Sequence, residues 1–264
     1  MFKLVAMDLD DTLLDEEKKV PKDTADILKR LHDNGIHIVI SSGRMTPTQM
    51  SIAKAFTQDI SYISYNGSVV VFEDGQRAEF DIPVDKIREV VRYCNEEHLY
   101  VVIYHNESIY AQTYEEGLRY DIDTINARSV EIMDFLEGEI FPTPKIVILA
   151  HPDKVPAIVK DVEKRFPNLF ITRSNSAVIE FMPKGVGKES GLKLVCEHLG
   201  IDREEVIAFG DNYNDMSMVE WAGMGVAVAN SVDDLKAVAD KVSVKERSEG
   251  VAEVLREVFS DILR

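Results

Sequence analysis

The stretch KLVAMDLDDT, residues 3–12, joins a short apolar run directly to an acidic segment. Its apolar part, residues 3–7, has the length and composition of a buried strand, and the aspartates begin where that strand should end. A second apolar run, IHIVI at residues 36–40, stops in the same way at SSGR, residues 41–44. We therefore expect two buried strands, each followed by a polar loop.

A helix is expected between these strands, over residues 22–34, where Ala25, Leu28 and Leu31 recur on one helical face. The alternation of strand and helix returns late in the chain, with helical patterns over 189–199 and 216–222 and strand-like runs over 205–209 and 225–228. Such alternation predicts an α/β fold, with a Rossmann-like parallel sheet core that carries helices on both faces.

The middle of the chain lacks this steady alternation. Apolar or alternating runs occur at 68–72, 100–104, 108–112, 145–150 and 177–182, and helical patterns at 84–98 and 153–166. We expect residues 83–184 to form an α+β domain inserted into a core made of residues 1–82 and 185–264. Before this insertion, Asn66-Gly67 lies between strand-like runs and favours a hairpin turn, with a place near the active site as the alternative.

Composition and charge restrict the classes of partner. The chain is 45% hydrophobic and 29% charged, as globular proteins are, and its net charge of −17 would repel a nucleic-acid backbone. Cys94 and Cys196 lack metal or redox spacing, and no stretch resembles a signal peptide or a membrane span. We expect a cytoplasmic protein without nucleic-acid or membrane partners.

The DxDxT pattern at residues 8–12 suits phosphoryl transfer. An aspartate at a strand end can attack phosphorus and form an acyl phosphate, which is the role we predict for Asp8. In an extended segment Asp10 would share a face with Asp8 and could protonate the leaving alcohol and then deprotonate water. A solvated acidic turn is the alternative interpretation.

A cation is needed where two carboxylates face a phosphate, and Mg²⁺ prefers oxygen ligands of this kind. The segment GDNYND, residues 210–215, offers Asp211 after a predicted strand and Asp215 one helical turn later. A helix N-cap cluster would explain the same residues.

Two further segments could hold phosphate. Ser42 and Gly43 offer a hydroxyl and a backbone N–H after the second strand, although ordinary turn chemistry also explains them. Lys188 precedes the helix predicted over 189–199 and could reach a phosphate as a point charge, whereas most lysines are only solvated.

Taken together, DxDxT at 8–12, Ser42-Gly43-Arg44, Lys188 and GDxxxD at 210–215 resemble the haloacid dehalogenase-like (HAD) superfamily in order and setting. The chain is most similar to the Cof-type phosphatase branch, over essentially its whole length. The resemblance implies that residues 83–184 form a cap domain that determines substrate specificity. In two departures from the usual pattern, Asp11 stands where many relatives have glycine and Ser42 where many have threonine.

The resemblance also implies a role for each motif residue. Asp8 would be the nucleophile and a magnesium ligand, and Asp10 the general acid/base, with its carbonyl on the metal. Asp211 would be the remaining protein ligand of the metal, and Asp215 would support the metal indirectly, through its ligands or through water. Thr12 would orient the loop that carries Asp8 and Asp10. Phosphate would be held by Leu9 through its backbone, Ser42, Gly43, Lys188 and Asn214.

The expected function is Mg²⁺-dependent hydrolysis of a small phosphorylated metabolite, such as a sugar phosphate. A phosphomutase of the same superfamily is one alternative, because it would use the same nucleophile and acid/base pair. A non-catalytic phospho-acceptor or metabolite-binding module is the other. The sequence contains no coiled-coil seam that would indicate an oligomeric state.

Overall fold

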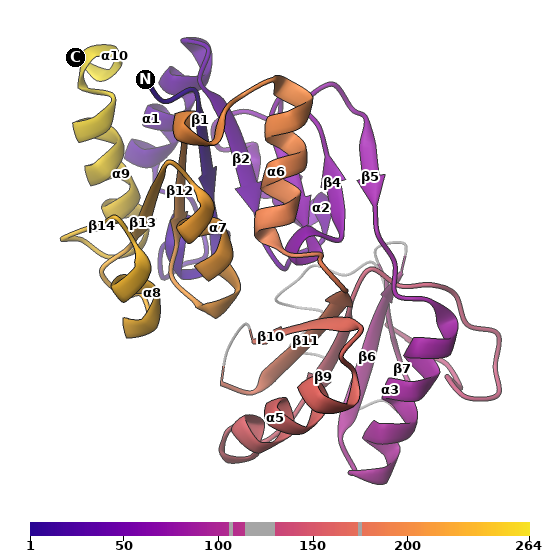
Figure 1. Cartoon of the computed structure of the whole chain (residues 1–264). Helices are drawn as coiled ribbons and strands as arrows, with labels where there is room; N and C mark the ends of the chain where they lie inside the picture. The colour runs from indigo at the N-terminus through magenta and orange to yellow at the C-terminus, as the bar shows by residue number, and fades with distance from the viewer. Residues whose placement is uncertain (106–107, 114–129, 174–175) are drawn as a thin grey trace. The chain divides into compact units, whose positions relative to one another are not determined.

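The chain divides into two compact units, Met1–Ala78 together with Gly187–Arg264, and Glu79–Val186. The computed structural model describes all residues except 106–107, 114–129 and 174–175 (Figure 1). The first unit contains an eight-stranded sheet in the order β14-β13-β12-β1-β2-β3-β4-β5, and the second a six-stranded sheet in the order β10-β11-β9-β6-β7-β8.

Strand β1 (Leu4–Met7) is the point at which the strand order of the first sheet reverses. It lies between β2 (His37–Ser41) and β12 (Val206–Gly210) and runs parallel to both. The chain continues from β2 to β3 (Ser61–Ser64) on one side, and much later from β12 to β13 (Met224–Ala227) on the other. The carboxyl ends of β1, β2 and β12 therefore meet where such sheets bind ligands.

The edges of this sheet are shorter and less regular. Strand β4 (Val69–Val71) is antiparallel to β3, and β5 (Arg77–Glu79) and β14 (Lys241–Val242) are the outermost strands. Asn66 makes the turn between β3 and β4 with a positive φ of 55°, which confirms the predicted hairpin turn.

Helices cover both faces of this sheet because apolar side chains of its strands point alternately to each side. In β1, Val5 and Met7 pack in the core beneath α1 (Lys22–Asp33) and α9 (Arg247–Val258). Leu4 and Ala6 pack with α6 (Lys188–Leu199) and α7 (Met216–Trp221) on the opposite face (Figure 1). The predicted α/β fold class is therefore confirmed.

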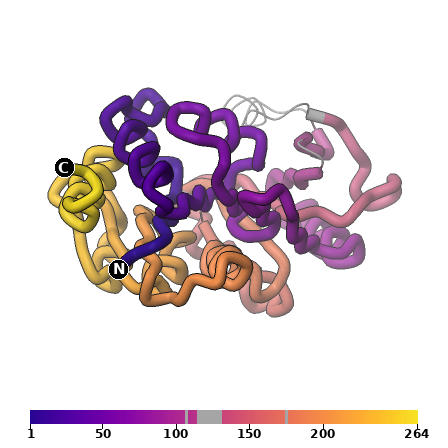
Figure 2. The backbone as a smooth tube through the Cα atoms, turned by 90° about the horizontal axis from the view of Figure 1, so that it is seen from above, coloured from indigo at the N-terminus to yellow at the C-terminus, as the bar shows by residue number. Residues whose placement is uncertain are grey.

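The first unit also contains the α-helices α2 (Thr46–Ala53), α8 (Asp233–Val238) and α10 (Ser260–Leu263). Arg30 of α1 donates hydrogen bonds to the carbonyl oxygens of Ile262 and Leu263, at 2.9 and 3.2 Å. These bonds tie the C-terminal end of the chain, yellow in Figure 2, to a helix from its beginning.

The described residues of the second unit form an α+β fold, in which helices pack against a sheet. Its strands are β6 (Tyr100–His105), β7 (Ser108–Ala111), β8 (Val130–Ile132), β9 (Ile146–Leu149), β10 (Leu169–Arg173) and β11 (Val178–Pro183). Helices α3 (Val84–Glu96) and α5 (Val155–Arg165) pack on it. Val90, Ile103 and Phe181 are among the buried residues of this core.

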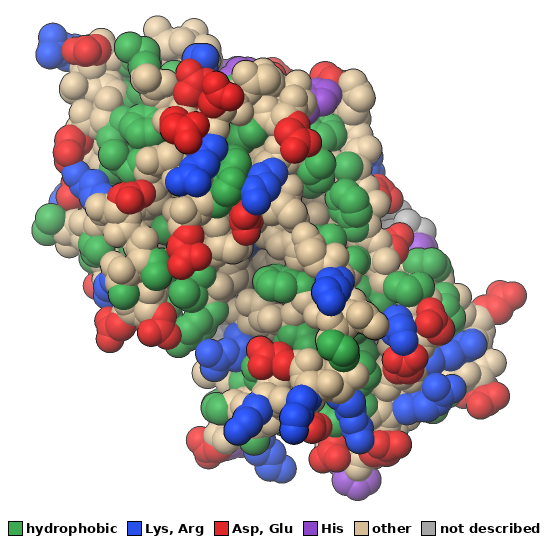
Figure 3. Space-filling model, viewed as in Figure 1, with side chains coloured by type: hydrophobic (Ala, Val, Ile, Leu, Met, Phe, Trp, Pro, Cys, Tyr) green, Lys and Arg blue, Asp and Glu red, His purple; other side chains and the backbone are tan. Residues whose placement is uncertain are grey.

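The surface seen in Figure 3 carries charges of both signs. Lys and Arg side chains lie among Asp and Glu side chains there and do not form a continuous basic stripe.

Within the described part of the chain, none of the helices combines the length and hydropathy that crossing a membrane requires.

The position of helix α6 against the sheet depends on close contacts at two glycines. A Cβ on Gly67 would lie 2.2 Å from the carbonyl oxygen of Gly187, the residue before α6 begins. A Cβ on Gly191, one turn into α6, would lie 2.7 Å from a methyl group of Ile63 in β3. The first turn of α6 can approach the sheet this closely only because these side chains are absent.

We predict that Gly67→Ala destabilises the protein by more than Gly75→Ala. Both glycines have positive φ, 111° and 86°, but a Cβ on Gly75 would meet nothing within 4 Å. Alanine should cost about 1–2 kcal/mol for the strained backbone at either position, and at Gly67 about 1–3 kcal/mol more for the clash. Urea unfolding measures both free energies, and equal losses in the two variants would contradict close packing at Gly67.

Candidate active site

Lys188 joins two buried carboxylates at the carboxyl end of β1. Its Nζ lies 2.5 Å from Asp8 Oδ1 and 2.5 Å from Asp215 Oδ1. Asp8 follows the last residue of β1, and Lys188 begins α6. All three residues are buried, with exposed fractions of 6%, 1% and 0% for Asp8, Lys188 and Asp215. The lysine that the motif singled out is therefore not a solvated surface residue.

Burial and mutual attraction govern the titration of this group. Burial raises the pKa of Asp8 well above its ordinary value, and the charges of Asp215 and Asp211 add to that effect, although Lys188 opposes it. For Lys188, burial would lower the pKa, but the neighbouring Asp215 and Asp8 carboxylates raise it above the ordinary value. Lys188 is consequently held as a cation.

Asp211 extends this group into a cluster of three acids. Carboxylate oxygens of Asp8, Asp211 and Asp215 all lie within 4.8 Å of one another. Thr12 Oγ1 donates a 2.7 Å hydrogen bond to Asp211 Oδ1. Asp215 Oδ2 accepts hydrogen bonds from the backbone N–H groups of Asp211 and Asn212, at 3.0 and 3.1 Å. Asp211 precedes the short helical turn at Tyr213–Asp215, so the two acids meet because Asp215 caps the start of that turn, as the alternative interpretation predicted, and not because they lie one helical turn apart.

The charge of this cluster suits a divalent cation. Three carboxylates share one ammonium group, and burial, together with the Asp215 charge, raises the pKa of Asp211 to about 7. Oxygen atoms from buried carboxylates are the ligands that Mg²⁺ prefers, and a bound cation would relieve their repulsion. The donor set therefore fits the predicted metal.

Asp10 is not part of this cluster. Strand β1 ends at Met7 and residues Leu9–Leu13 form a tight turn, although the backbone is extended at both Asp8 and Asp10. That the two side chains share a face stays a prediction. Both oxygens of Asp10 instead accept hydrogen bonds from Arg44, and Lys18 Nζ lies 3.5 Å away. Burial acts to raise the pKa of Asp10, but Arg44 and Lys18 outweigh it and lower the pKa.

The conformation and contacts of Asp11 show how an aspartate fits where many relatives have glycine. Its φ is +61°, a conformation that glycine adopts most easily but aspartate also tolerates. Arg247 Nε donates a 3.1 Å hydrogen bond to Asp11 Oδ1, and Asn230 Nδ2 donates one of 2.8 Å to its carbonyl oxygen. These contacts come from the C-terminal part of the chain and brace the turn.

Two of the remaining predicted phosphate-binding residues, Ser42 and Asn214, contact Asn66. The backbone N–H of Asn66 donates a 3.1 Å hydrogen bond to the carbonyl oxygen of Ser42, and its Oδ1 accepts a 3.1 Å bond from Asn214. Asn66 therefore links the loop after β2 to the loop after β12. Gly43 lies next to Ser42 and is partly exposed, whereas Leu9 is fully buried in the turn after β1.

Sequence reasoning missed several residues of this site. The motif Ser42-Gly43-Arg44 indicates no role for Arg44, and the sequence favours a turn at Asn66. Asn230 and Arg247 were not identified at all, because they meet Asp11 across 219 and 236 positions. The Asn66-Gly67 dipeptide was a usable signal, whereas no local pattern marks the other contacts.

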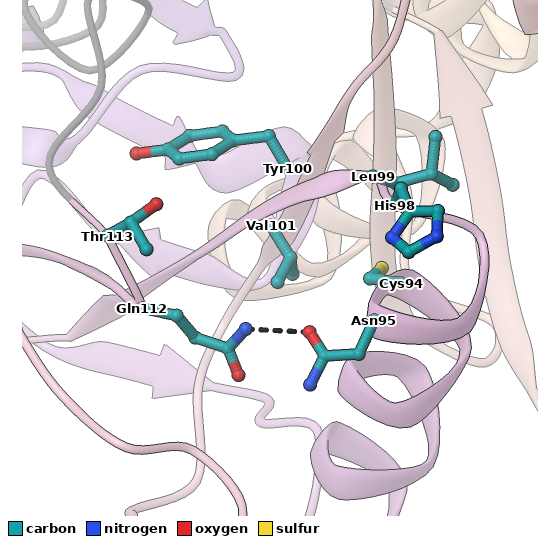
Figure 4. A pocket seen from close by; sticks show the side chains of 8 residues that line it. All are labelled: Cys94, Asn95, His98, Leu99, Tyr100, Val101, Gln112 and Thr113. Atoms are coloured by element: carbon teal, nitrogen blue, oxygen red, sulfur yellow. Dashed lines mark hydrogen bonds between the residues drawn. The ribbon is translucent and has the colours of Figure 1, made fainter.

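A separate cavity of about 410 Å³ lies in the second unit (Figure 4). It is lined by residues of α3 and β6, of the loop between them and of the segment after β7, and a 2.7 Å hydrogen bond joins Gln112 to Asn95 at its wall. Among the described residues that line it, none is a lysine, arginine or carboxylic acid. This cavity therefore lacks the charges that the cluster at Asp8 provides.

Comparison with known proteins points to one family. A family model described as haloacid dehalogenase-like hydrolase matches residues 5–255. The chain is 29% identical to the 5-amino-6-(5-phospho-D-ribitylamino)uracil phosphatase YitU of Bacillus subtilis, with 97% of each chain covered. It resembles the crystal structure of a haloacid dehalogenase-like hydrolase from Bacteroides thetaiotaomicron, with a TM-score of 0.86, 28% identity and coverage of 98% and 100% of the two chains.

We predict that Asp211→Asn stabilises the metal-free protein increasingly as the pH rises. The raised pKa means that folded wild type keeps a proton between pH 4 and 7 that the unfolded chain has lost, so its stability falls as pH rises through that range. Asparagine carries no such charge and can still accept the bond from Thr12. The gain should reach on the order of 2 kcal/mol at pH 8.

Thermal melts with a chelator at pH 5 and pH 8 measure this gain. The exposed Asp26→Asn is the matched control and should show no pH-dependent difference from wild type. An Asp211→Asn variant that is equally stable relative to wild type at both pH values would contradict repulsion within the acid cluster.

Proposed function

The chain belongs to the haloacid dehalogenase-like hydrolase family, and we propose that it is a Mg²⁺-dependent phosphatase of small phosphorylated metabolites. One observation carries the proposal: the Asp8 carboxylate is buried at a strand end, held by Lys188, within a cluster of acids. That arrangement gives a nucleophile, a fixed cation and oxygen ligands at one point.

The metal would be held by Asp8, Asp211 and the backbone carbonyl of Asp10, with Asp215 supporting it indirectly, through its ligands or through water. When bound, Mg²⁺ supplies positive charge that offsets the repulsion between the carboxylates and a phosphate dianion. The hydrogen bonds from Thr12 to Asp211 and from two backbone N–H groups to Asp215 hold the acids in place.

Asp8 attacks phosphorus in the first step. Among the described residues, hydrogen bonds hold only its Oδ1, and Oδ2 is the oxygen from which attack would begin. A phosphorus–oxygen bond forms to Asp8 as the bond to the alcohol breaks, and Asp10, in its protonated form, transfers its proton to the alcohol oxygen and becomes a carboxylate. Lys188 neutralises part of the charge on the phosphate, while Ser42, Gly43, Asn214 and the backbone of Leu9 orient its oxygens.

The second unit, Glu79–Val186, is proposed to be the cap domain that determines substrate specificity. We propose a small substrate such as a sugar phosphate, and the ribityl phosphate for which the Bacillus subtilis relative is named belongs in any substrate panel.

Both cysteines, Cys94 and Cys196, are free and buried, which supports a reducing, cytoplasmic environment.

We predict that Asp8→Asn lowers kcat/KM for p-nitrophenyl phosphate about a thousandfold or more, because an amide cannot form the acyl phosphate. The variant should fold, since the substitution keeps the shape of the side chain and removes a buried charge. Phosphate release with Mg²⁺ and with a chelator measures turnover and its metal dependence. Asp8→Ala, which deamidation cannot revert, and the exposed Asp26→Asn serve as controls. Retained turnover in both Asp8 variants would refute covalent catalysis by this residue.

A further inference from the structure

The guanidinium group of Arg44 donates two hydrogen bonds to the carboxylate of Asp10. Nε donates to Asp10 Oδ2 at 2.7 Å, and Nη2 donates to Oδ1 at 2.5 Å. The side chain of Arg44 is 10% exposed, whereas that of Asp10 is 37% exposed. A bidentate pair of this kind fixes the plane of the carboxylate as well as its position. Asp10 is therefore oriented by the protein and does not move freely in solvent.

The backbone of Arg44 is itself held firmly. Its N–H donates a 3.2 Å hydrogen bond to Ser42 Oγ, and its carbonyl oxygen accepts a 3.0 Å bond from Gln49 Nε2. The backbone N–H of Tyr65 donates to the same carbonyl oxygen at 3.3 Å. Lys18, the other cation near Asp10, has a half-exposed side chain and lies farther away, at 3.5 Å. Arg44 is thus the better anchored of the two.

Asp10 without Arg44 would have two poorer positions available. It could turn outward to water, or turn toward Lys188 and the metal ligands. Either movement changes the position and the plane of the carboxylate, and an error of about 1 Å in such a group can cost on the order of a hundredfold in rate.

We propose that Arg44 is a positioning residue that holds Asp10 as the base for hydrolysis of the aspartyl phosphate. In that step Asp10 takes a proton from water as the water oxygen bonds to phosphorus. The bond between phosphorus and Asp8 breaks, its electron pair returns to the Asp8 carboxylate, and inorganic phosphate is released. The inference rests on the proposed function and assigns the residue that the motifs left without a role.

The two half-reactions can be separated by the choice of substrate. p-Nitrophenolate leaves without protonation, so formation of the aspartyl phosphate from p-nitrophenyl phosphate needs no acid from Asp10. Hydrolysis of the intermediate always needs a base. A residue that positions Asp10 should therefore affect decay of the intermediate much more than its formation with this substrate.

The test measures both rates by rapid quench with Mg²⁺ and ³²P-labelled p-nitrophenyl phosphate, followed by an unlabelled chase. For Arg44→Gln we expect the decay rate to fall about 10- to 100-fold, a share of what general base catalysis contributes. The formation rate should change less than about threefold, because that step does not use Asp10 as an acid here. Labelled intermediate should accumulate, and Arg44→Lys should restore decay in part, because one ammonium replaces the two-point contact.

Arg247→Gln is the matched control, because it breaks an arginine–carboxylate contact to Asp11 in the same turn without touching Asp10. It should leave the ratio of decay to formation unchanged. If formation and decay fall together in Arg44→Gln, or if neither changes, the inference is overturned. A shift in the ratio for Arg247→Gln equal to that for Arg44→Gln would also overturn it, in favour of general loosening of the loop. Absence of any labelled intermediate in wild type would instead refute the proposed function, and the inference with it.

Discussion

The Lys188 ammonium, bridging Asp8 and Asp215, is the interaction on which the site depends. Carboxylates close together in a poorly solvated site repel one another, and burial raises the free energy of each charge. Lys188 is fully buried between two of them and offsets that cost in part. The remaining negative charge is what makes the cluster suited to a cation. Repulsion within this cluster thus lowers the stability of the metal-free fold at the place where metal binding and catalysis are proposed.

The fold brings these groups together through backbone geometry. The reversal of strand order at β1 places the loops after β1, β2 and β12 at one edge of the sheet. Gly67 and Gly191 then allow α6, and with it Lys188, to approach that edge. In the turn after β1, Arg44 holds the Asp10 carboxylate and Arg247 holds that of Asp11. Rigid supports of this kind keep reactive groups in position.

Much of this could be predicted from the sequence, because the strands that carry the motifs are continuous apolar runs and end at the motif residues. Elements without such a signal were missed: β3 is only SYIS, and α2, TPTQMSIA, has no clear apolar face. In the site, the motifs indicated Asp8, Lys188, Asp211 and Asp215, which do come together. The contacts of Asp10 and Asp11 were not predictable, since they depend on how the turn after β1 folds and on partners 34 and 236 positions away.

The central claim is that phosphate passes through a covalent bond to Asp8. Borohydride reduces an acyl phosphate to an alcohol, so trapping the enzyme during turnover and sequencing its peptides by mass spectrometry identifies the residue that carries phosphate. The account predicts homoserine at position 8, in the presence of substrate and Mg²⁺ only. Aspartate that stays intact at position 8 while turnover proceeds, or homoserine at another position, would contradict it.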